Sequence, residues 1–239
     1  MPDDLDIFSF NRPPNPERPL QGMTVLVVED SRFASEAVRL LCLRSGARIR
    51  RADTLAAAHR HLAVYRPSIV IIDLGLPDGD GAELIGELSQ ASPRVSAIFG
   101  TSGDDNCREK AIRAGADGFF AKPIESLAVF QHMVLEALPQ GEGPTGPRAV
   151  PDDMITPDPL SLQDDLTLMA ETINQAPHGE TLDYIAQFLG GVARSAHDMD
   201  LEAAAAGLAS ARAMGRKTGM DLARVAGIIH ERLEGGRAV

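Results

Sequence analysis

The chain has few cysteines, no excess of positive charge and no long hydrophobic run. Its two cysteines, Cys42 and Cys107, lie in different predicted helices and show no metal-binding spacing, which fits a reducing, cytoplasmic location. The formal net charge of −11 argues against nucleic-acid binding, because such binding needs a basic face. No apolar run approaches the roughly 18–20 residues that span a bilayer, and from the acidic start we expect no signal peptide. We therefore expect no membrane segment.

Composition divides the chain into four segments. Residues 1–21 are rich in proline and predict a flexible, disordered tail. Residues 22–138 alternate short apolar runs with amphipathic stretches. Residues 139–159 hold six prolines and three glycines and predict a linker. Residues 160–235 carry only helical patterns and predict a small all-α bundle, which we interpret as an output or dimerisation domain.

The alternating pattern of residues 22–138 predicts an α/β fold with a doubly wound, five-stranded parallel sheet. Its most diagnostic run is Ile69–Ile72, which is continuous and β-branched, as in a central parallel strand. The predicted strands are Met23–Val28, Ala47–Arg50, Ile69–Ile72, Val95–Phe99 and Gly118–Ala121. The predicted helices between and after them are 32–44, 54–65, 81–90, 104–114 and 124–138.

Within residues 160–235 we predict four helices. The first two are Ser161–Gln175 and Thr181–His197, and the third and fourth begin at the capping residues Asp198 and Thr218. Apolar side chains recur along each stretch at helical spacing. The sequence therefore predicts a four-helix bundle.

Polar side chains stand at the ends of the predicted strands of the α/β segment. They are Glu29, Asp30, Asp73, Thr101 and Lys122. The carboxyl ends of parallel strands share one edge of a sheet, where ligands bind. We therefore expect three carboxylates, a hydroxyl and an ammonium group to converge on one pocket.

This set of groups suits a divalent metal and a phosphoryl group. Three carboxylates within a few ångströms repel one another by a few kcal/mol per pair in a partly buried site, and a cation such as Mg²⁺ relieves that repulsion. With the metal in place, Asp73 can attack phosphorus directly as an ionised nucleophile, without a separate base. Lys122 supplies a second cation, and Thr101 supplies a hydroxyl donor for a phosphoryl oxygen.

Four stretches resemble the receiver domain of two-component response regulators: VLVVEDS, IVIIDLGLPDGDG, FGTSGD and AGADGFFAKPI. The resemblance covers about residues 22–138. It implies a CheY-like domain in which Asp73 is the phosphoacceptor. It also implies that Mg²⁺ is held by Glu29, Asp30, Asp73 and the backbone carbonyl of Gly75, and that Thr101 and Lys122 contact the phosphoryl group.

The same resemblance implies a conformational switch. Thr101 would move toward the phosphoryl group, and the aromatic ring of Phe119 would then rotate inward. The Lys122-Pro123 peptide is expected to be cis, as is usual in this family. Because side chains alternate along a strand, we expect one of Phe119 and Phe120 to be buried and the other exposed.

The function that follows is a response regulator of a phosphorelay, relaying its signal through a helical protein-interaction domain. Its partners would be a sensor histidine kinase or a phosphotransfer protein, with a homodimer through the receiver or helical domain as a further option. We expect no enzyme activity beyond the receiver's own phosphorylation and dephosphorylation.

Two alternatives concern the helical segment. It could be an antiterminator-like RNA- or DNA-binding domain with a basic patch of Arg212, Arg216, Lys217 and Arg224, although residues 151–239 hold 14 acidic and 7 basic side chains. It could instead be a phosphotransfer bundle that uses His197. The residues after that histidine do not match the lysine and small residues expected at such a site.

Overall fold

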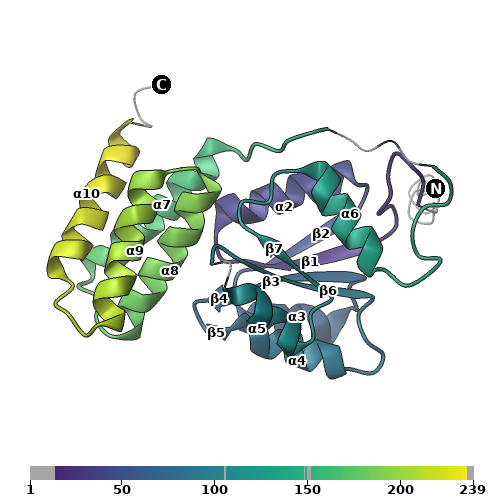
Figure 1. The fold of residues 1–239 in the computed structure, drawn as a ribbon, viewed down its shortest axis with the longest axis horizontal. Coiled ribbons are helices and arrows are strands. Elements are labelled where there is room, and N and C mark those ends of the chain that lie inside the picture. The colour runs from purple at the N-terminus through teal and green to yellow at the C-terminus, as the bar shows by residue number, and fades with distance from the viewer. Residues whose placement is uncertain (1–13, 105, 148, 150–151, 236–239) are drawn as a thin grey trace, which may run out of the picture.

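The structure is a computed structural model that describes residues 14–104, 106–147, 149 and 152–235. The first thirteen residues of the predicted tail lie outside it. The described residues form an α/β unit (residues 14–138) and a helical unit (residues 159–235), which lie side by side (Figure 1). Each unit has its own buried core.

The α/β unit is built on a five-stranded parallel sheet with the order β2-β1-β3-β6-β7. This arrangement confirms the predicted doubly wound fold. Strands β1 and β3 lie inside the sheet and read as uninterrupted apolar runs, because helices cover both of its faces. The strands are β1 (Thr24–Val28), β2 (Arg48–Ala52), β3 (Ile69–Asp73), β6 (Ala97–Ser102) and β7 (Gly118–Ala121).

Helices cover the sheet on both faces, as Figure 1 shows. Helices α2 (Arg32–Arg44) and α6 (Leu127–Ala137) pack on one face, where residues such as Leu41 and Phe130 fill the first core. The other face carries the second core, to which Ala58, Ile85 and Ala111 contribute. Its helices are α3 (Leu55–Val64), α4 (Gly81–Gln90) and α5 (Cys107–Ala114).

Capping side chains account for where two of these helices begin. Helix α3 starts after Thr54, as predicted, because the hydroxyl of Thr54 accepts a hydrogen bond from the Ala57 amide. Helix α6 starts three residues later than predicted, because Ser126 accepts from the Val129 amide. A short antiparallel pair, β4 (Gly75–Leu76) and β5 (Gly79–Asp80), follows β3 and was not predicted.

The prediction that only one of Phe119 and Phe120 is buried was wrong. Their side chains do alternate along β7, yet both are almost fully buried. Phe119 belongs to the core on the α5 face, and Phe120 packs between the rings of Phe99 and Phe130 on the α6 face. The physical reason is that β7, although it is an edge strand, is covered by helices on both faces.

Two segments outside the regular elements contribute to the core of the α/β unit. Leu20 is fully buried, and its amide donates to the carbonyl of Ser45. Within residues 139–159, the amide of Ile155 donates to the carbonyl of Glu125, and the Ile155 side chain packs into the first core. The segment that leads to the helical unit is thus held beside the start of α6.

The helical unit is the expected all-α bundle of four helices. Asp158 caps α7, with Pro159 in the first turn, and Asp198 caps α9 as predicted. The alanine-rich face of α9, including Ala204 and Ala205, packs closely against α8. The helices are α7 (Pro159–Asn174), α8 (Glu180–Ser195), α9 (Met199–Ala213) and α10 (Gly219–Gly235).

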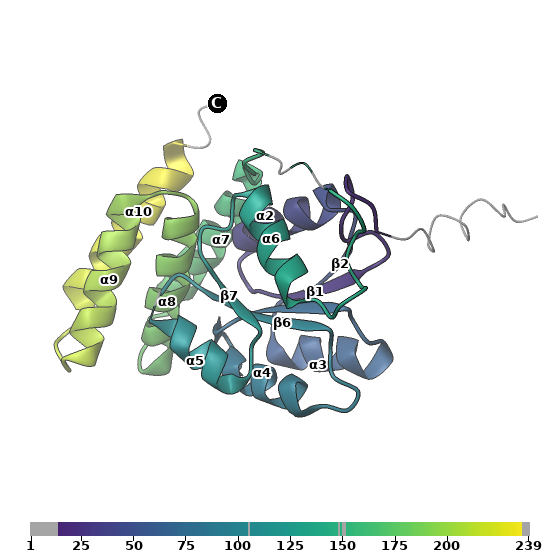
Figure 2. The ribbon, with the colours of Figure 1, turned by 45° about the vertical axis from the view of Figure 1, so that its right-hand side comes forward.

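The helical unit packs against one side of the α/β unit. Its contacts there involve mainly α7 and α8, which meet α2 and β4 (Figures 1 and 2). This side includes the carboxyl edge of the sheet, because β4 directly follows β3. Within the described part of the chain, no helix combines the length and the hydrophobicity needed to cross a membrane.

Candidate functional site

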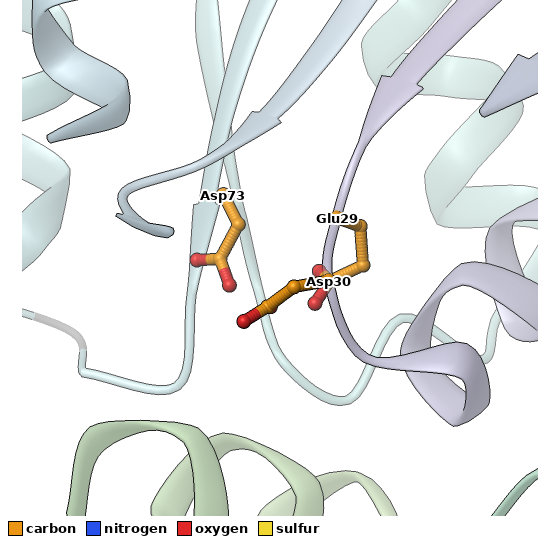
Figure 3. A group of neighbouring side chains, drawn as sticks. All are labelled: Glu29, Asp30 and Asp73. Carbon is orange, nitrogen blue, oxygen red and sulfur yellow. The ribbon is translucent and has the colours of Figure 1, made fainter. Parts of the chain in front are cut away.

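The five polar residues singled out from the sequence lie at the carboxyl edge of the sheet. Glu29 and Asp30 directly follow β1, Asp73 is the last residue of β3, and Lys122 directly follows β7. Thr101 lies in β6, in register with Asp73. Figure 3 shows the side chains of Glu29 and Asp30 coming from the β1 side and that of Asp73 from β3, all directed toward the same space.

The three carboxylates are close enough to share one ion. One oxygen from each of Glu29, Asp30 and Asp73 lies within 4.8 Å of the others. The Lys122 ammonium group bridges two of them, with its Nζ 2.7 Å from Oε2 of Glu29 and 2.9 Å from Oδ2 of Asp73. One cation therefore faces three acidic groups, which leaves excess negative charge in a largely buried pocket.

Burial and this negative charge both affect the pKa values of the acids. Burial, with the neighbouring carboxylates, raises the pKa of Glu29 well above its usual range despite the attraction of Lys122. Burial and the charge of Asp73 raise the pKa of Asp30 from 3.8 to about 6. Burial alone would lower the pKa of Lys122, but attraction by Asp73 and Glu29 raises it above its ordinary value, so the lysine is charged.

These residues fit a magnesium ion. Mg²⁺ prefers oxygen ligands, uses one or two carboxylates and keeps several waters. The pocket offers three carboxylates from two strand ends, and Gly75 lines it beside them. The pKa values of Glu29 and Asp30 are raised first by burial and then by repulsion from the neighbouring carboxylates, and a bound divalent cation would counter both effects.

Thr101 brings a hydroxyl group without a partner to the same edge. Its Oγ1 is buried, and among the described residues it is the one buried side-chain polar atom without a hydrogen bond. An unpaired buried hydroxyl is unfavourable by roughly 1–3 kcal/mol, so such groups usually have a partner. A phosphoryl oxygen bound to Asp73 would supply an acceptor.

Comparison with known proteins identifies the family. Residues 25–133 match the family model of the response regulator receiver domain. The chain is also 30% identical to the chemotaxis protein CheY of Halobacterium salinarum over 106 residues, which are 44% of this chain and 88% of that protein. The chain belongs to the response regulator receiver family. The matched residues lie within the α/β unit and include the acidic pocket.

A longer relative matches over less than half of its length. The KDP operon transcriptional regulatory protein KdpE of Escherichia coli is 35% identical over 100 residues, which are 42% of this chain and 44% of KdpE. The chain thus covers less than half of that relative. Among solved structures, it is similar to a putative response regulator from Chloroflexus aurantiacus, with 27% identity, a TM-score of 0.42, and coverage of 48% of this chain and 93% of that one.

Residues of the helical unit also contact residues at the pocket, and the sequence did not predict these contacts. The Tyr184 hydroxyl donates a 2.8 Å hydrogen bond to Oδ2 of Asp30, and the Gln187 side chain lies against Gly75. Asp165 accepts three hydrogen bonds from the residues that follow Asp30. No sequence pattern predicts such contacts, because single Asp, Tyr and Gln residues are common on amphipathic helices.

Two candidate residues of the helical unit, His197 and Arg212, are paired with acidic side chains. His197 hydrogen-bonds Glu125 at 2.8 Å, and Arg212 forms an ion pair with Asp183 at 2.6 Å. The guanidinium group of Arg108 lies 5.5 Å from the centre of the buried Phe119 ring. The Lys122-Pro123 peptide bond is cis, as the resemblance implied.

Proposed function

We propose that this protein is a cytoplasmic response regulator of a two-component phosphorelay, phosphorylated on Asp73 in a Mg²⁺-dependent reaction. The observation that carries the proposal is a cluster of three carboxylates within a receiver domain, two of which are bridged by Lys122. The phosphodonor would be the phosphohistidine of a sensor kinase or of a phosphotransfer protein, with small phosphodonors as substitutes. A homodimer through either unit belongs to the same proposal.

Asp73 would act as the nucleophile. One oxygen of its carboxylate attacks phosphorus, the bond from phosphorus to the donor's nitrogen breaks, and the electron pair leaves with the imidazole. The product is an acyl phosphate on Asp73. Asp73 is poised for this step because it is buried at the end of a rigid strand, where packing restricts its position.

Glu29, Asp30, Asp73 and the carbonyl of Gly75 would hold Mg²⁺, which supplies positive charge that neutralises the phosphoryl oxygens. Lys122 would add the second positive charge. Its ammonium group already lies 2.9 Å from Oδ2 of Asp73, so it can pair with a phosphoryl oxygen after only a small movement. Burial strengthens both interactions, because the local dielectric constant is lower than that of water.

Thr101 and Phe119 would report the phosphorylated state. The unpaired Thr101 hydroxyl would donate to a phosphoryl oxygen and so draw β6 toward Asp73. Gly100 and Phe119 are register partners in β6 and β7, so movement at Thr101 changes the packing around the Phe119 ring. That change would be relayed to the helical unit, for which we propose protein interaction and no enzymatic output.

The test is phosphorylation of the full chain with acetyl phosphate or phosphoramidate and Mg²⁺, followed by intact mass and peptide mapping. We expect one added phosphoryl group on Asp73, dependence on Mg²⁺, and no product in Asp73→Asn. Substitution of the exposed Asp53 by asparagine is the matched control and should leave the reaction unchanged. The proposal is contradicted if neither the wild type nor a variant with an undocked helical unit takes up a phosphoryl group.

A further inference from the structure

The helical unit covers the acidic pocket of the receiver domain. Residues of α7 and α8 make the contact, and we call four of them the docking face: Asp165, Tyr184, Gln187 and Gly191. In Figure 3 a green helix of the helical unit runs below the three carboxylates. The docking face therefore occupies the side of the pocket that opens away from the sheet.

Asp165 binds the N-terminus of α2. Its Oδ2 accepts hydrogen bonds from the Ser31 hydroxyl at 2.7 Å and the Phe33 amide at 3.0 Å, and its Oδ1 accepts from the Arg32 amide at 2.8 Å. The Asp165 side chain is buried, with 1% of its surface exposed. A buried carboxylate needs such partners, and the free amides and dipole of a helix N-terminus provide them. This contact is specific to the docked arrangement.

Tyr184 and Gln187 contact residues assigned to the metal. The Tyr184 hydroxyl donates to Oδ2 of Asp30 at 2.8 Å. The Gln187 amide lies so close to Gly75 that a Cβ atom on Gly75 would come within 1.8 Å of Nε2. Docking thus places groups of the helical unit directly on two positions of the proposed metal site.

Gly191 lets the backbone of α8 approach the receiver domain closely. A Cβ on Gly103 would lie 3.1 Å from the Gly191 Cα, and a Cβ on Gly191 would lie 3.8 Å from Nζ of Lys122. A longer side chain at position 191 would therefore collide with Lys122. The neighbouring Gly190 differs, because nothing lies within 4 Å of a Cβ placed there.

The space left between the two units is too small for the reaction. The pocket lined by Asp73, Lys122, Gln187 and Gly191 has a volume of about 20 Å³. That volume holds about one water molecule. A phosphoryl group with a hydrated Mg²⁺ needs several times more space. The docked helical unit and a bound phosphodonor are therefore mutually exclusive.

The docking face carries no histidine that could accept a phosphoryl group from Asp73. Gln187 and Gly191 are the α8 residues that line the pocket with Phe188. The candidate acceptor His197 is bound to Glu125 and does not line the pocket. The contact therefore resembles a receiver-binding surface without a transfer residue.

We infer that the docking face is a binding surface for the phosphoacceptor edge of a receiver domain, occupied by the receiver domain of the same chain while Asp73 is unphosphorylated. The helical unit then blocks the phosphodonor until it undocks. By linkage, phosphorylation of Asp73 favours the undocked state as strongly as undocking favours phosphorylation. The blocking of the phosphodonor rests on the proposed phosphorylation of Asp73. The docking of the helical unit does not depend on that proposal.

The first experiment measures docking without any phosphodonor. Gly191→Leu should undock the helical unit, and Gly190→Leu is its control, because both substitutions have the same effect on helix propensity. Hydrogen exchange at the amides of Arg32 and Phe33 reports the contact with Asp165. We expect these amides to be protected in the wild type and in Gly190→Leu. In Gly191→Leu they should exchange faster by roughly tenfold or more, with unchanged helical content by circular dichroism.

Equal protection in Gly191→Leu and in the wild type would overturn the inference. Protection in the wild type that is lost on dilution would overturn the assignment to the same chain, since it would show a second copy on the docking face.

The second experiment measures the labelling rate of Asp73 by acetyl phosphate and Mg²⁺. We expect Gly191→Leu and Asp165→Ala to be labelled roughly three- to tenfold faster than the wild type, as the loss of one or two docking contacts implies. Glu171→Ala, an exposed change on α7, is the control for Asp165→Ala and should match the wild type. Equal rates in all variants would overturn the inference, whereas no labelling of any variant would contradict the proposed phosphorylation alone.

Discussion

The Tyr184 hydroxyl donates a 2.8 Å hydrogen bond to the carboxylate of Asp30, across 154 positions of sequence. One partner belongs to the second helix of the bundle, and the other follows the first strand of the receiver domain. The bond ties the helical unit to a carboxylate that would otherwise be available to a cation. It makes the chemistry of the pocket depend on the position of the helical unit.

The first prediction concerns this bond. Tyr184→Phe should bind Mg²⁺ more tightly by roughly two- to tenfold, because Asp30 no longer shares its oxygen with the hydroxyl. Titration calorimetry of the full chain with Mg²⁺ measures the affinity. The chain has only two tyrosines, so Tyr65→Phe is the matched control and should bind as the wild type does. Weaker or unchanged binding in Tyr184→Phe would contradict the competition.

The second prediction concerns pH. The pKa of Asp30 is raised from 3.8 to about 6 in the folded protein. The protonated Asp30 side chain therefore makes a favourable contribution to the free energy of unfolding, which is present in full below pH 3.8 and is lost as the pH rises through 6. Above that pH the carboxylate lowers the free energy of unfolding. In metal-free buffer, Asp30→Asn should raise this free energy by roughly 1–3 kcal/mol at pH 8, because the amide removes the charge and keeps an acceptor for Tyr184.

Urea unfolding of Asp30→Asn between pH 4 and 8 checks the prediction. The gain over the wild type should shrink toward pH 4, where Asp30 itself is largely protonated. The exposed Asp53→Asn should show no such trend. A gain that does not change with pH would rule out ionisation as its cause.

The third prediction concerns the unpaired hydroxyl of Thr101. Thr101→Val keeps the shape and removes a buried polar atom without a partner, so it should stabilise the unphosphorylated protein by about 1 kcal/mol. Thermal unfolding measures this gain. Thr167→Val on α7 is the contrast, because the Thr167 hydroxyl donates to the Gln163 carbonyl. This substitution removes a paired hydroxyl and should not stabilise the protein. Destabilisation of Thr101→Val would show that the hydroxyl has a partner in solution.

The fourth prediction concerns the core beneath the pocket. Phe120 packs with its ring centre 4.9 Å from that of Phe99 and 5.6 Å from that of Phe130. Phe120→Ala should therefore lower the free energy of unfolding by roughly 3–5 kcal/mol through lost burial and the resulting cavity. The exposed Val129→Ala should change it by less than about 1 kcal/mol. A small effect at Phe120 would mean that β7 is less covered by α6 than the structure indicates.

Much of the fold was predictable from local patterns. The apolar run Ile69–Ile72 is too short for a helix and too continuous for a half-exposed strand, so it indicated a central parallel strand. Thr54 and Asp198 correctly predicted the starts of the helices that they cap. The start of α6 was harder to predict, because the choice of Ser126 as the cap depends on one side-chain hydrogen bond.

The burial of Phe119 and Phe120 depended on tertiary structure. Alternation along β7 says that the two rings point to opposite faces, and it cannot say whether both faces are covered. Helices α5 and α6 decide that, and they follow β6 and β7 in the chain without any local signal of where they pack. Burial is a property of the assembled layers.

The sequence by itself determined that acidic groups, a hydroxyl and a lysine stand at the carboxyl ends of strands. The local hydrophobic pattern predicts where each strand ends, and the alternation of strands with helices predicts a parallel sheet. Only the tertiary structure decided that Gln187 and Gly191 line that pocket and that Tyr184 and Asp165 bind Asp30 and Ser31 beside it. Their contacts join segments that lie far apart in the sequence, and such pairings depend on how the two units pack against each other. Whether the pocket is open or covered is therefore a property of the docked units.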